Sequence, residues 1–177
     1  MKEFDVIIVG GGMIGLSLVV ELSKKMELSI AIIDPNNCNP TITDSFHTRV
    51  SAITPSTQDF LCSINVWDKI KRKKGFSATK VWDQNSHGHL NFYAKDEGIE
   101  YLGHIVENDL IQAALFNAVD QSKVTMINAK LTELTKTDSG YTLDLDNGES
   151  YSCNLLIGAD GPQSKVRGLA EIQVTEH

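Results

Sequence analysis

The chain has 177 residues, 41% of them hydrophobic, which suits one ordinary globular domain and is short for two. Its 23 acidic residues outnumber its 16 basic residues and give a net charge of −7, which argues against a general nucleic-acid-binding protein. No apolar run in the sequence approaches the roughly 20 residues that cross a membrane. The three cysteines and five histidines lack metal-ligand spacing, so we expect free thiols in a reducing compartment and no metal site.

The first 34 residues are predicted to form one β-α-β unit. Residues 4–9 and 28–33 are apolar runs typical of buried strands, and the apolar residues from Ile14 to Met26 have the spacing of a helix packed on a sheet. Between the first strand and the helix, Gly10, Gly12 and Gly15 form the G-x-G-x-x-G pattern of dinucleotide-binding folds.

Each position of this pattern is glycine for a separate physical reason. Gly10 allows the tight strand-to-helix turn, and Gly15 lets the helix pack close to the strand. Gly12 lets the helix N-terminus, with Met13 and Ile14 as its first residues, bring backbone N–H groups up to a pyrophosphate. The alternative interpretation is a glycine-rich turn in an α/β core that binds no nucleotide.

Asp34 ends the second strand and follows Gly12 by close to the roughly 20 residues expected for the carboxylate that accepts the ribose hydroxyls. An acid at this place favours an unphosphorylated ribose, and therefore FAD or NAD over NADP. The alternative is an ordinary surface aspartate.

The middle of the chain is predicted to contain a polar loop over 35–48, a helix from Pro55 to about Ile64 capped by Thr54, and a second helix over 108–119. Strands over 80–83 and 89–93 are joined by a hairpin turn at 85–88. The basic run 69–74 is interpreted as a solvated helix end, with contact to an anionic membrane surface as the alternative.

Alternating strands are predicted over 124–127, 130–134 and 141–145, followed by a strand that includes Tyr151 and a buried strand over 155–157. Asn147-Gly148 predicts a tight hairpin in which both residues have positive φ. An NAD dehydrogenase domain would continue β-α-β-α-β, so the antiparallel interruption indicates a flavoprotein. The predicted fold class is α/β, a Rossmann-like FAD-binding domain with an inserted antiparallel β excursion.

The segment 158–167, Gly-Ala-Asp-Gly-Pro-Gln-Ser-Lys-Val-Arg, resembles the "D-G" motif of single-component FAD-dependent aromatic hydroxylases, which are similar to para-hydroxybenzoate hydroxylase. The resemblance implies that Asp160, Gly161 and Arg167 lie near the flavin and nicotinamide cofactors and support their binding. The alternative is an ordinary Asp-Gly-Pro turn that closes a strand.

Two further segments resemble the same family. Residues 49–54 resemble the segment whose arginine contacts the FAD diphosphate, which maps onto Arg49. Residues 103–108, together with Asn65-Val66-Trp67, resemble the ubiquinone-biosynthesis hydroxylase branch. In the wider family the helix that starts here faces the flavin, so the resemblance implies a cofactor role for Gln112, with an exposed helix residue as the alternative.

The resemblance implies an FAD-dependent aromatic-ring hydroxylase of ubiquinone biosynthesis, which uses NAD(P)H and O₂ to hydroxylate a polyprenylated phenol. The cofactor carries the chemistry in such enzymes, so we name no catalytic acid or base. Two alternatives stay open: another FAD oxidoreductase such as an amine oxidase or an epoxidase, and a non-catalytic nucleotide-binding fragment or partner in a biosynthetic complex.

The resemblance spans residues 4 to about 170 and matches only the first part of the family. We therefore expect residues 1–177 to be the N-terminal part of an FAD-binding domain, with the start of the substrate-domain sheet at about 76–105 and the C-terminal half absent. Apolar sheet edges exposed in this way predict self-association into a homo-oligomer. We expect a cytoplasmic protein, with peripheral contact at the inner membrane because the implied substrate partitions there.

Overall fold

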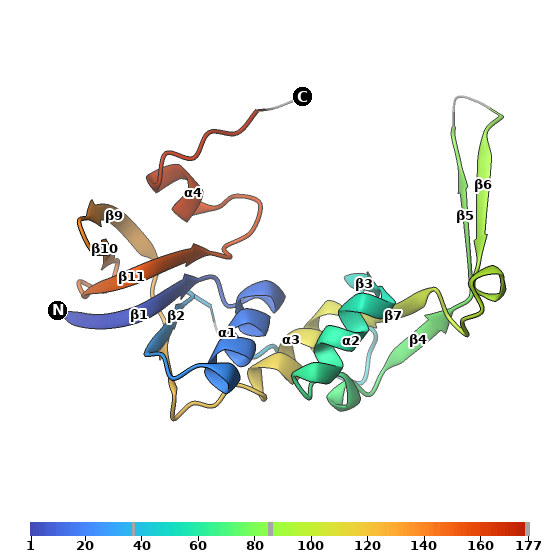
Figure 1. Ribbon diagram of the computed structural model, residues 1–177, viewed down its shortest axis with the longest axis horizontal. Helices are drawn as coiled ribbons and strands as arrows, with labels where there is room; N and C mark the ends of the chain where they lie inside the picture. The colour runs from blue at the N-terminus through green and yellow to red at the C-terminus, as the bar shows by residue number, and fades with distance from the viewer. Residues whose placement is uncertain (37, 85–86, 176–177) are drawn as a thin grey trace. The chain divides into compact units, whose positions relative to one another are not determined.

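The computed structural model describes residues 1–36, 38–84 and 87–175, and it divides into two compact units (Figure 1). The first unit combines residues 1–40 with the chain from residue 115 onward, and the second comprises residues 41–114. The boundary falls inside helix α3 (Asn108–Phe116).

The first unit is built on a six-stranded sheet with the strand order β8-β2-β1-β11-β10-β9. Its strands, in chain order, are β1 (Lys2–Val9), β2 (Ile30–Ile33), β8 (Val124–Ile127), β9 (Leu131–Thr137), β10 (Gly140–Leu145) and β11 (Ser150–Gly158). The neighbours β8, β2, β1 and β11 run parallel, and β10 and β9 continue the sheet antiparallel. Helix α1 (Met13–Lys25) connects β1 to β2, and the short helix α4 (Lys165–Leu169) follows β11. The predicted α/β class with an antiparallel excursion is confirmed.

The core of the first unit explains why its parallel strands are continuous apolar runs. All four residues of β2 are buried, as are the last four of β1, because a parallel sheet is covered on both faces. Helix α1 packs through one stripe of residues, namely Gly15, Leu16, Val19, Val20 and Ser23. The expectation that Ile14 and Met26 pack with this stripe was wrong: they are 73% and 50% exposed, because they lie on the other side of the helix or beyond its end.

The hairpin between β10 and β11 differs from its prediction. Gly148 has a φ of +83°, but Asn147 is not among the described residues with positive φ. Asn147 instead uses its side chain, since its Oδ1 accepts the N–H of Glu149 at 3.0 Å. The N–H of Gly148 donates to the carbonyl of Leu145 at 3.0 Å, so glycine alone supplies the left-handed residue. The strand that follows is also longer than expected, because Tyr151 and residues 155–157 belong to the single strand β11.

The second unit contains a three-stranded antiparallel sheet of order β3-β7-β4 and a separate two-stranded hairpin β5-β6. Its elements are β3 (Val50–Ile53), α2 (Pro55–Ser63), the 3₁₀ turn η1 (Trp67–Lys69), β4 (Lys73–Phe76), β5 (Ala78–Trp82), β6 (His89–Tyr93), the 3₁₀ turn η2 (Ala94–Glu97), β7 (Gly103–Glu107) and most of α3. The predicted helix at Pro55 is confirmed, with Thr54 accepting the N–H of Thr57 at its N-terminus. The hairpin strands are confirmed as well, while Asn85 and Ser86 of the predicted turn lie outside the described residues.

The basic run 69–74 is not a helix end. Only Lys69 belongs to η1, and Lys73 begins β4. The Nζ of Lys73 donates to the carbonyl of Ile70 at 2.7 Å and lies 5.0 Å from the centre of the Trp67 ring. Part of this charge therefore serves local structure.

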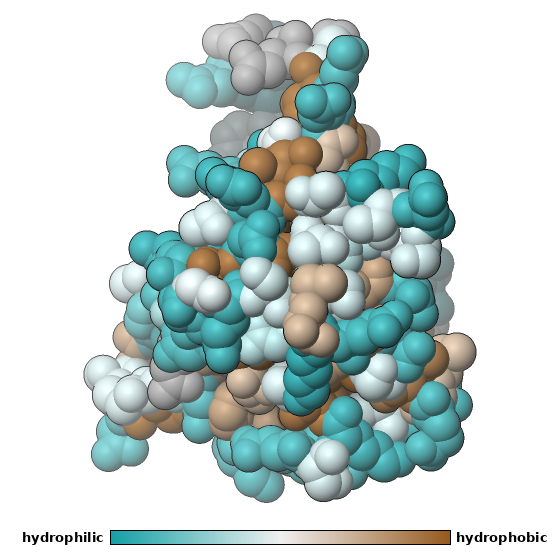
Figure 2. All heavy atoms as spheres, turned by 90° about the vertical axis from the view of Figure 1, so that its left-hand side faces the viewer, coloured by the Kyte–Doolittle hydropathy of each residue, from teal (hydrophilic) through white to brown (hydrophobic). Residues whose placement is uncertain are grey.

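Among the described residues no helix combines the length and apolar character needed to span a bilayer. Cys38, Cys62 and Cys153 form no disulfide within the described part of the chain. Exposed apolar side chains of the first unit include Leu155 and Ile172. Figure 2 shows apolar residues in patches among hydrophilic ones on the face that it draws.

Candidate functional site

The turn after β1 has a backbone that only glycine adopts easily. Gly10 has a φ of +112°, and a Cβ added there would lie 2.3 Å from the carbonyl oxygen of Ala159. Its N–H donates to the carbonyl of Ile33 at 2.8 Å, which ties the turn to the end of β2. Gly10 is thus fixed from both neighbouring strands, β2 and β11.

Gly15 and Gly12 differ in the space around them. A Cβ on Gly15 would lie 1.9 Å from the carbonyl oxygen of Gly10, so the helix touches the turn backbone. A Cβ on Gly12 would have no described atom within 4 Å, so the space in front of it is open. The backbone of Gly12 is extended (φ −76°, ψ −174°) and tolerates any residue, which means that folding alone does not demand glycine there.

The N-terminus of α1 offers donors to a ligand. The first hydrogen bond within the helix runs from the N–H of Leu16 to the carbonyl of Gly12 at 3.0 Å, so the N–H groups of Met13 and Ile14 precede the helical ladder. Gly12 has no side chain with which to cap them, and the first turn carries no acidic residue. A 13-residue helix adds its partial positive charge at this end. The arrangement suits an anion.

Asp34 lies beside this turn, half-buried. One carboxylate oxygen, Oδ2, accepts the N–H of Gly11 at 2.6 Å, and the other accepts the N–H of Asn36 at 2.8 Å. Both bonds come from backbone groups, and carboxylate oxygens can each accept a second hydrogen bond. Asp34 is therefore oriented by the turn and keeps acceptor capacity for a hydroxyl group.

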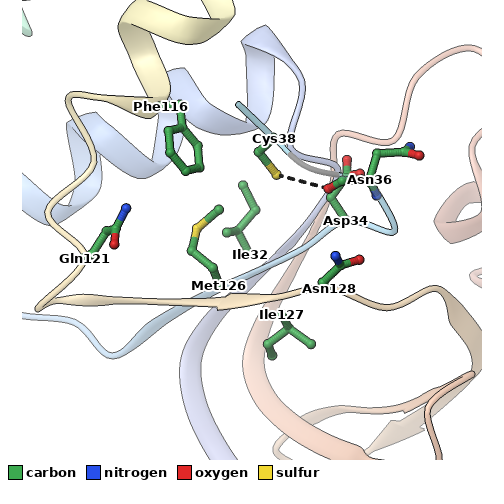
Figure 3. Close-up of a pocket in the computed structure, with 9 residues that line it drawn as sticks. All are labelled: Ile32, Asp34, Asn36, Cys38, Phe116, Gln121, Met126, Ile127 and Asn128. Atoms are coloured by element: carbon green, nitrogen blue, oxygen red, sulfur yellow. Dashed lines mark hydrogen bonds between the residues drawn. The ribbon is translucent and has the colours of Figure 1, made fainter. Parts of the chain in front are cut away.

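A cavity of about 360 Å³ opens next to Asp34 (Figure 3). In Figure 3 the side chains of Ile32, Phe116 and Met126 lie close together, while the Cys38 sulfur points toward Asn36, which lies with Asp34 at one side. The full set of lining residues is Ile32, Asp34, Asn36, Cys38, Phe116, Gln121, Met126, Ile127 and Asn128. An apolar interior with amide and carboxylate groups around it suits a flat ring that carries polar substituents.

Sequence reasoning missed Gly11 and Cys38. A Cβ on Gly11 would lie 2.1 Å from the Cys38 Sγ, so the loop after β2 folds back directly onto the glycine turn. Burial, and secondarily the charge of Asp34, raises the pKa of the Cys38 thiol to about 11, which keeps it protonated at neutral pH. The sequence signal for this contact was Gly11 itself, a glycine between Gly10 and Gly12 that the G-x-G-x-x-G pattern does not require.

The turn after β11 carries the predicted D-G residues. Asp160 accepts three hydrogen bonds: from the Ser164 hydroxyl at 2.6 Å, from the Lys165 N–H at 2.6 Å and from the Val166 N–H at 3.1 Å. Burial raises the pKa of the Asp160 carboxyl, but these hydrogen bonds outweigh it and the pKa lies below its usual value. Gly161 has a φ of +85°, which explains the glycine after the aspartate.

Arg167 turns back onto the same motif. Its Nη2 donates to the carbonyl of Pro162 at 2.9 Å, and its own N–H donates to the Ser164 hydroxyl at 3.0 Å. The side chain is half-buried and lines a second cavity of about 390 Å³ together with Asp160 and Gly161.

The structure brings one group of predicted residues together within the first unit. The turns after β1 and β11 meet at Gly10 and Ala159, and Asp34 joins them through Gly11. Arg49 and Gln112 belong to the second unit. Arg49 is exposed just before β3, and Gln112 is half-buried in α3. No group of three or more potential metal ligands occurs within residues 1–36, 38–84 and 87–175.

Residues 3–177 match the family model described as an FAD binding domain. Among curated proteins, the chain is 33% identical over 175 residues to the 3-demethoxyubiquinol 3-hydroxylase of Escherichia coli (strain K12), which covers 96% of this chain and 44% of that protein. It is 31% identical over 188 residues to the mitochondrial ubiquinone biosynthesis monooxygenase COQ6 of Xenopus tropicalis, covering 96% of this chain and 40% of the relative. The chain thus spans less than half the length of these relatives.

Solved structures show the same fold. The p-nitrophenol 4-monooxygenase PnpA of Pseudomonas putida DLL-E4 superposes with a TM-score of 0.75 at 20% identity, over 96% of this chain and 44% of that chain. PqsL of P. aeruginosa, in complex with 2-aminobenzoylacetate, gives a TM-score of 0.77 at 15% identity, over 99% and 48% of the respective chains. The family model covers nearly every residue and the folds agree, so the chain belongs to the FAD-binding-domain family.

Proposed function

We propose that this chain is the FAD-binding part of a monooxygenase that hydroxylates an aromatic ring in ubiquinone biosynthesis, with NAD(P)H as reductant, O₂ as oxidant and a polyprenylated phenol as substrate. The observation that carries the proposal is the open N-terminus of α1 at Gly12, beside a carboxylate and an apolar cavity. The similarity to ubiquinone hydroxylases supports the substrate class.

The residues of the first unit fit the adenosine diphosphate part of FAD. A diphosphate needs several N–H donors and room for its oxygens, which the backbone from Gly12 to Gly15 offers where a side chain would otherwise stand. A ribose needs an acceptor for its hydroxyls, which Asp34 offers. The cavity next to Asp34 offers apolar walls and amide groups for a heteroaromatic ring.

The remaining predicted residues enter the proposal through the family resemblance. Arg49 would contact the diphosphate with a forked cation. Gln112 would face the flavin, and the segment of Asp160, Gly161 and Arg167 would support both cofactors. When bound, FAD supplies the redox chemistry with O₂, while the protein orients the ring and excludes water.

A polyprenylated phenol partitions into lipid, so we propose that the protein meets its substrate by peripheral contact at a membrane surface. Association into a homo-oligomer or a biosynthetic complex belongs to the same proposal.

The first test is the visible absorption spectrum of the purified chain, with and without added FAD. Retained flavin absorbance near one FAD per chain is expected, and its absence after addition of FAD would contradict binding by these residues. Incubation of the full-length monooxygenase that contains this chain with NADH or NADPH, O₂ and a polyprenylated phenol then separates the reactions. A hydroxylated ring in the product supports the proposal, an epoxide favours the epoxidase alternative, and no product contradicts both.

A further inference from the structure

The segment that precedes Arg49 is exposed, and it is held by an ion pair between the buried Glu107 and the half-buried Arg72. Glu107, the last residue of β7, is only 6% exposed. Its Oε1 accepts a hydrogen bond from Arg72 Nε at 2.9 Å, and its Oε2 accepts one from Arg72 Nη2 at 3.1 Å. The Oε2 also accepts the backbone N–H of His47 at 2.8 Å. Both oxygens of a buried charge are thus occupied.

Arg72 holds the other end of the same segment. Its Nη1 donates to the carbonyl oxygens of Thr43 at 2.8 Å and Asp44 at 3.2 Å. The guanidinium carbon lies 5.4 Å from the centre of the Phe46 ring. Arg72 and Glu107 therefore fix residues 43–47 by four side-chain-to-backbone and aromatic contacts, all inside the second unit.

Arg49 is anchored at its backbone by the same region. Its carbonyl accepts the N–H of Asn108 at 3.0 Å, one residue after Glu107. Its N–H donates to His47 Nδ1 at 3.4 Å, and its side chain is exposed. The backbone is held on both sides of a cation that remains accessible.

Burying a carboxylate costs free energy unless the charge is paired, and apolar contacts would attach a surface segment without that desolvation cost. What a bidentate arginine pair adds is a defined geometry, because the planar fork meets the carboxylate in one orientation. A ligand that meets a preset cation does not have to order the segment that carries it, so binding is tighter.

We propose that Glu107 and Arg72 are positioning residues for FAD: they hold residues 43–47, so that the backbone that carries Arg49 is ordered before the cofactor diphosphate binds. This inference rests on the proposed function, in which Arg49 contacts that diphosphate. Neither Glu107 nor Arg72 touches the cofactor in this account.

A double-mutant cycle tests the positioning role. FAD affinity is measured by quenching of flavin fluorescence for the unaltered chain, Glu107→Gln, Arg49→Ala and the double variant. We expect Glu107→Gln to weaken FAD binding about tenfold when Arg49 is present and less than about twofold when it is alanine. Equal losses in both backgrounds would overturn the positioning role, because Glu107 would then act without Arg49.

Amide hydrogen exchange of residues 42–50 gives a readout that needs no cofactor. We expect exchange of these amides to be about tenfold faster in Glu107→Gln and in Arg72→Lys. Arg72→Lys keeps the positive charge opposite Glu107 but loses the bidentate guanidinium. It therefore serves as the second test variant if Glu107→Gln fails to fold. Lys74→Gln is the matched control, since it removes a cation from the same basic run, and its exchange should equal that of the unaltered chain. Unchanged exchange in both test variants would overturn the inference.

The two proposals fail in distinguishable ways. If the unaltered chain does not bind FAD, the proposed function falls and this role falls with it. If the unaltered chain binds FAD and the cycle shows no coupling between Glu107 and Arg49, only the positioning role falls.

Discussion

Strands β1 and β11 lie side by side and parallel, and each ends in a glycine-containing turn that leads into a helix. The helix after β1 begins at an open N-terminus, with Gly12 as its first flanking residue and no side-chain cap from it. The helix after β11 begins at a closed one, where Asp160 accepts two backbone N–H groups and Ser164 accepts a third. The same local architecture thus leaves donors for a ligand in one turn and satisfies them internally in the other.

The two turns separate an aspartate that caps a helix from a glycine whose surroundings leave room for a ligand. Asp160 supplies to α4 the negative charge that a ligand must supply to α1. Folding requires Gly10, Gly15 and Gly161 through their φ or their close contacts, whereas Gly12 has an ordinary backbone and open space around it. Gly12 combines this open space with an uncapped helix N-terminus, and the two together point to a bound anion.

The largest expected effect is that of Gly15→Ala. The added Cβ would lie 1.9 Å from a backbone oxygen that cannot move without breaking the turn. We expect a loss of about 3 kcal/mol in the free energy of unfolding, at the upper end for overpacked sites. Urea denaturation followed by circular dichroism measures it, and a loss below about 0.5 kcal/mol, the size typical of a neutral surface site, would contradict the close contact of helix and turn.

The second largest effect on stability is expected from Asp160→Asn, which removes hydrogen bonds that cap α4. The amide keeps one acceptor oxygen where the carboxylate serves three donors, so we expect a loss of about 2 kcal/mol in the free energy of unfolding. Urea denaturation followed by circular dichroism measures this loss.

The stability difference between the unaltered chain and Asp160→Asn should depend on pH. The folded-state pKa of Asp160 is lowered, so its contribution is present above the unfolded pKa of about 3.9 and is lost as the pH falls through the folded value. The stability gap between the unaltered chain and Asp160→Asn should stay constant between pH 8 and pH 5, and narrow below about pH 4. A gap that does not change in acid would show that the carboxylate charge is not what holds α4.

Gly12→Ala probes the open turn without disturbing the fold. Alanine can adopt the backbone conformation of Gly12, and its Cβ would meet no described atom within 4 Å. The free energy of unfolding should therefore change by less than about 0.5 kcal/mol. The Cβ would occupy the space of a bound diphosphate, and we expect FAD affinity to fall about tenfold, or about 1.4 kcal/mol. Titration with FAD measures it.

Gly168→Ala is the matched control for this variant, because its Cβ also meets no described atom within 4 Å. It should leave FAD affinity unchanged. Equal affinities of the Gly12 and Gly168 variants would remove Gly12 from the binding site.

The smallest effect is expected from Ser164→Ala, which deletes the side chain that caps α4. The N–H of Arg167 loses its acceptor, for an expected loss of about 1 kcal/mol in stability. Ser164→Thr keeps the hydroxyl and should recover most of it. A threonine variant as unstable as the alanine variant would point to packing as the cause.

The sequence predicted the features that depend on neighbouring residues. The spacing of Gly10, Gly12 and Gly15 after an apolar run was sufficient for the β-α-β start, because strand, turn and helix are local in the chain. The family resemblance was confirmed by the match of residues 3–177 to the FAD-binding-domain model. The direction of the Ile14 side chain was predicted wrongly, since helical spacing does not show where the packed stripe begins.

Features that depend on distant segments could not be predicted. The cavity beside Asp34 combines the end of β2 with Phe116 and residues around β8, and only the sheet order β8-β2-β1 brings them together. The packing of Cys38 on Gly11 needs the loop after β2 to fold back, and the pair of Arg72 and Glu107 needs β4 beside β7. In each case the arrangement of strands and loops that are distant in the sequence, which residue types do not encode locally, decides the contact.

The central claim is that the open start of α1 binds the diphosphate of FAD, and backbone amide NMR during an FAD titration tests it most directly. We expect the amide signals of Gly12, Met13 and Ile14 to shift in proportion to the FAD bound, and we expect Gly12→Ala to weaken both the binding and these shifts. FAD binding that leaves these three signals unshifted would show that the diphosphate does not bind at the start of α1.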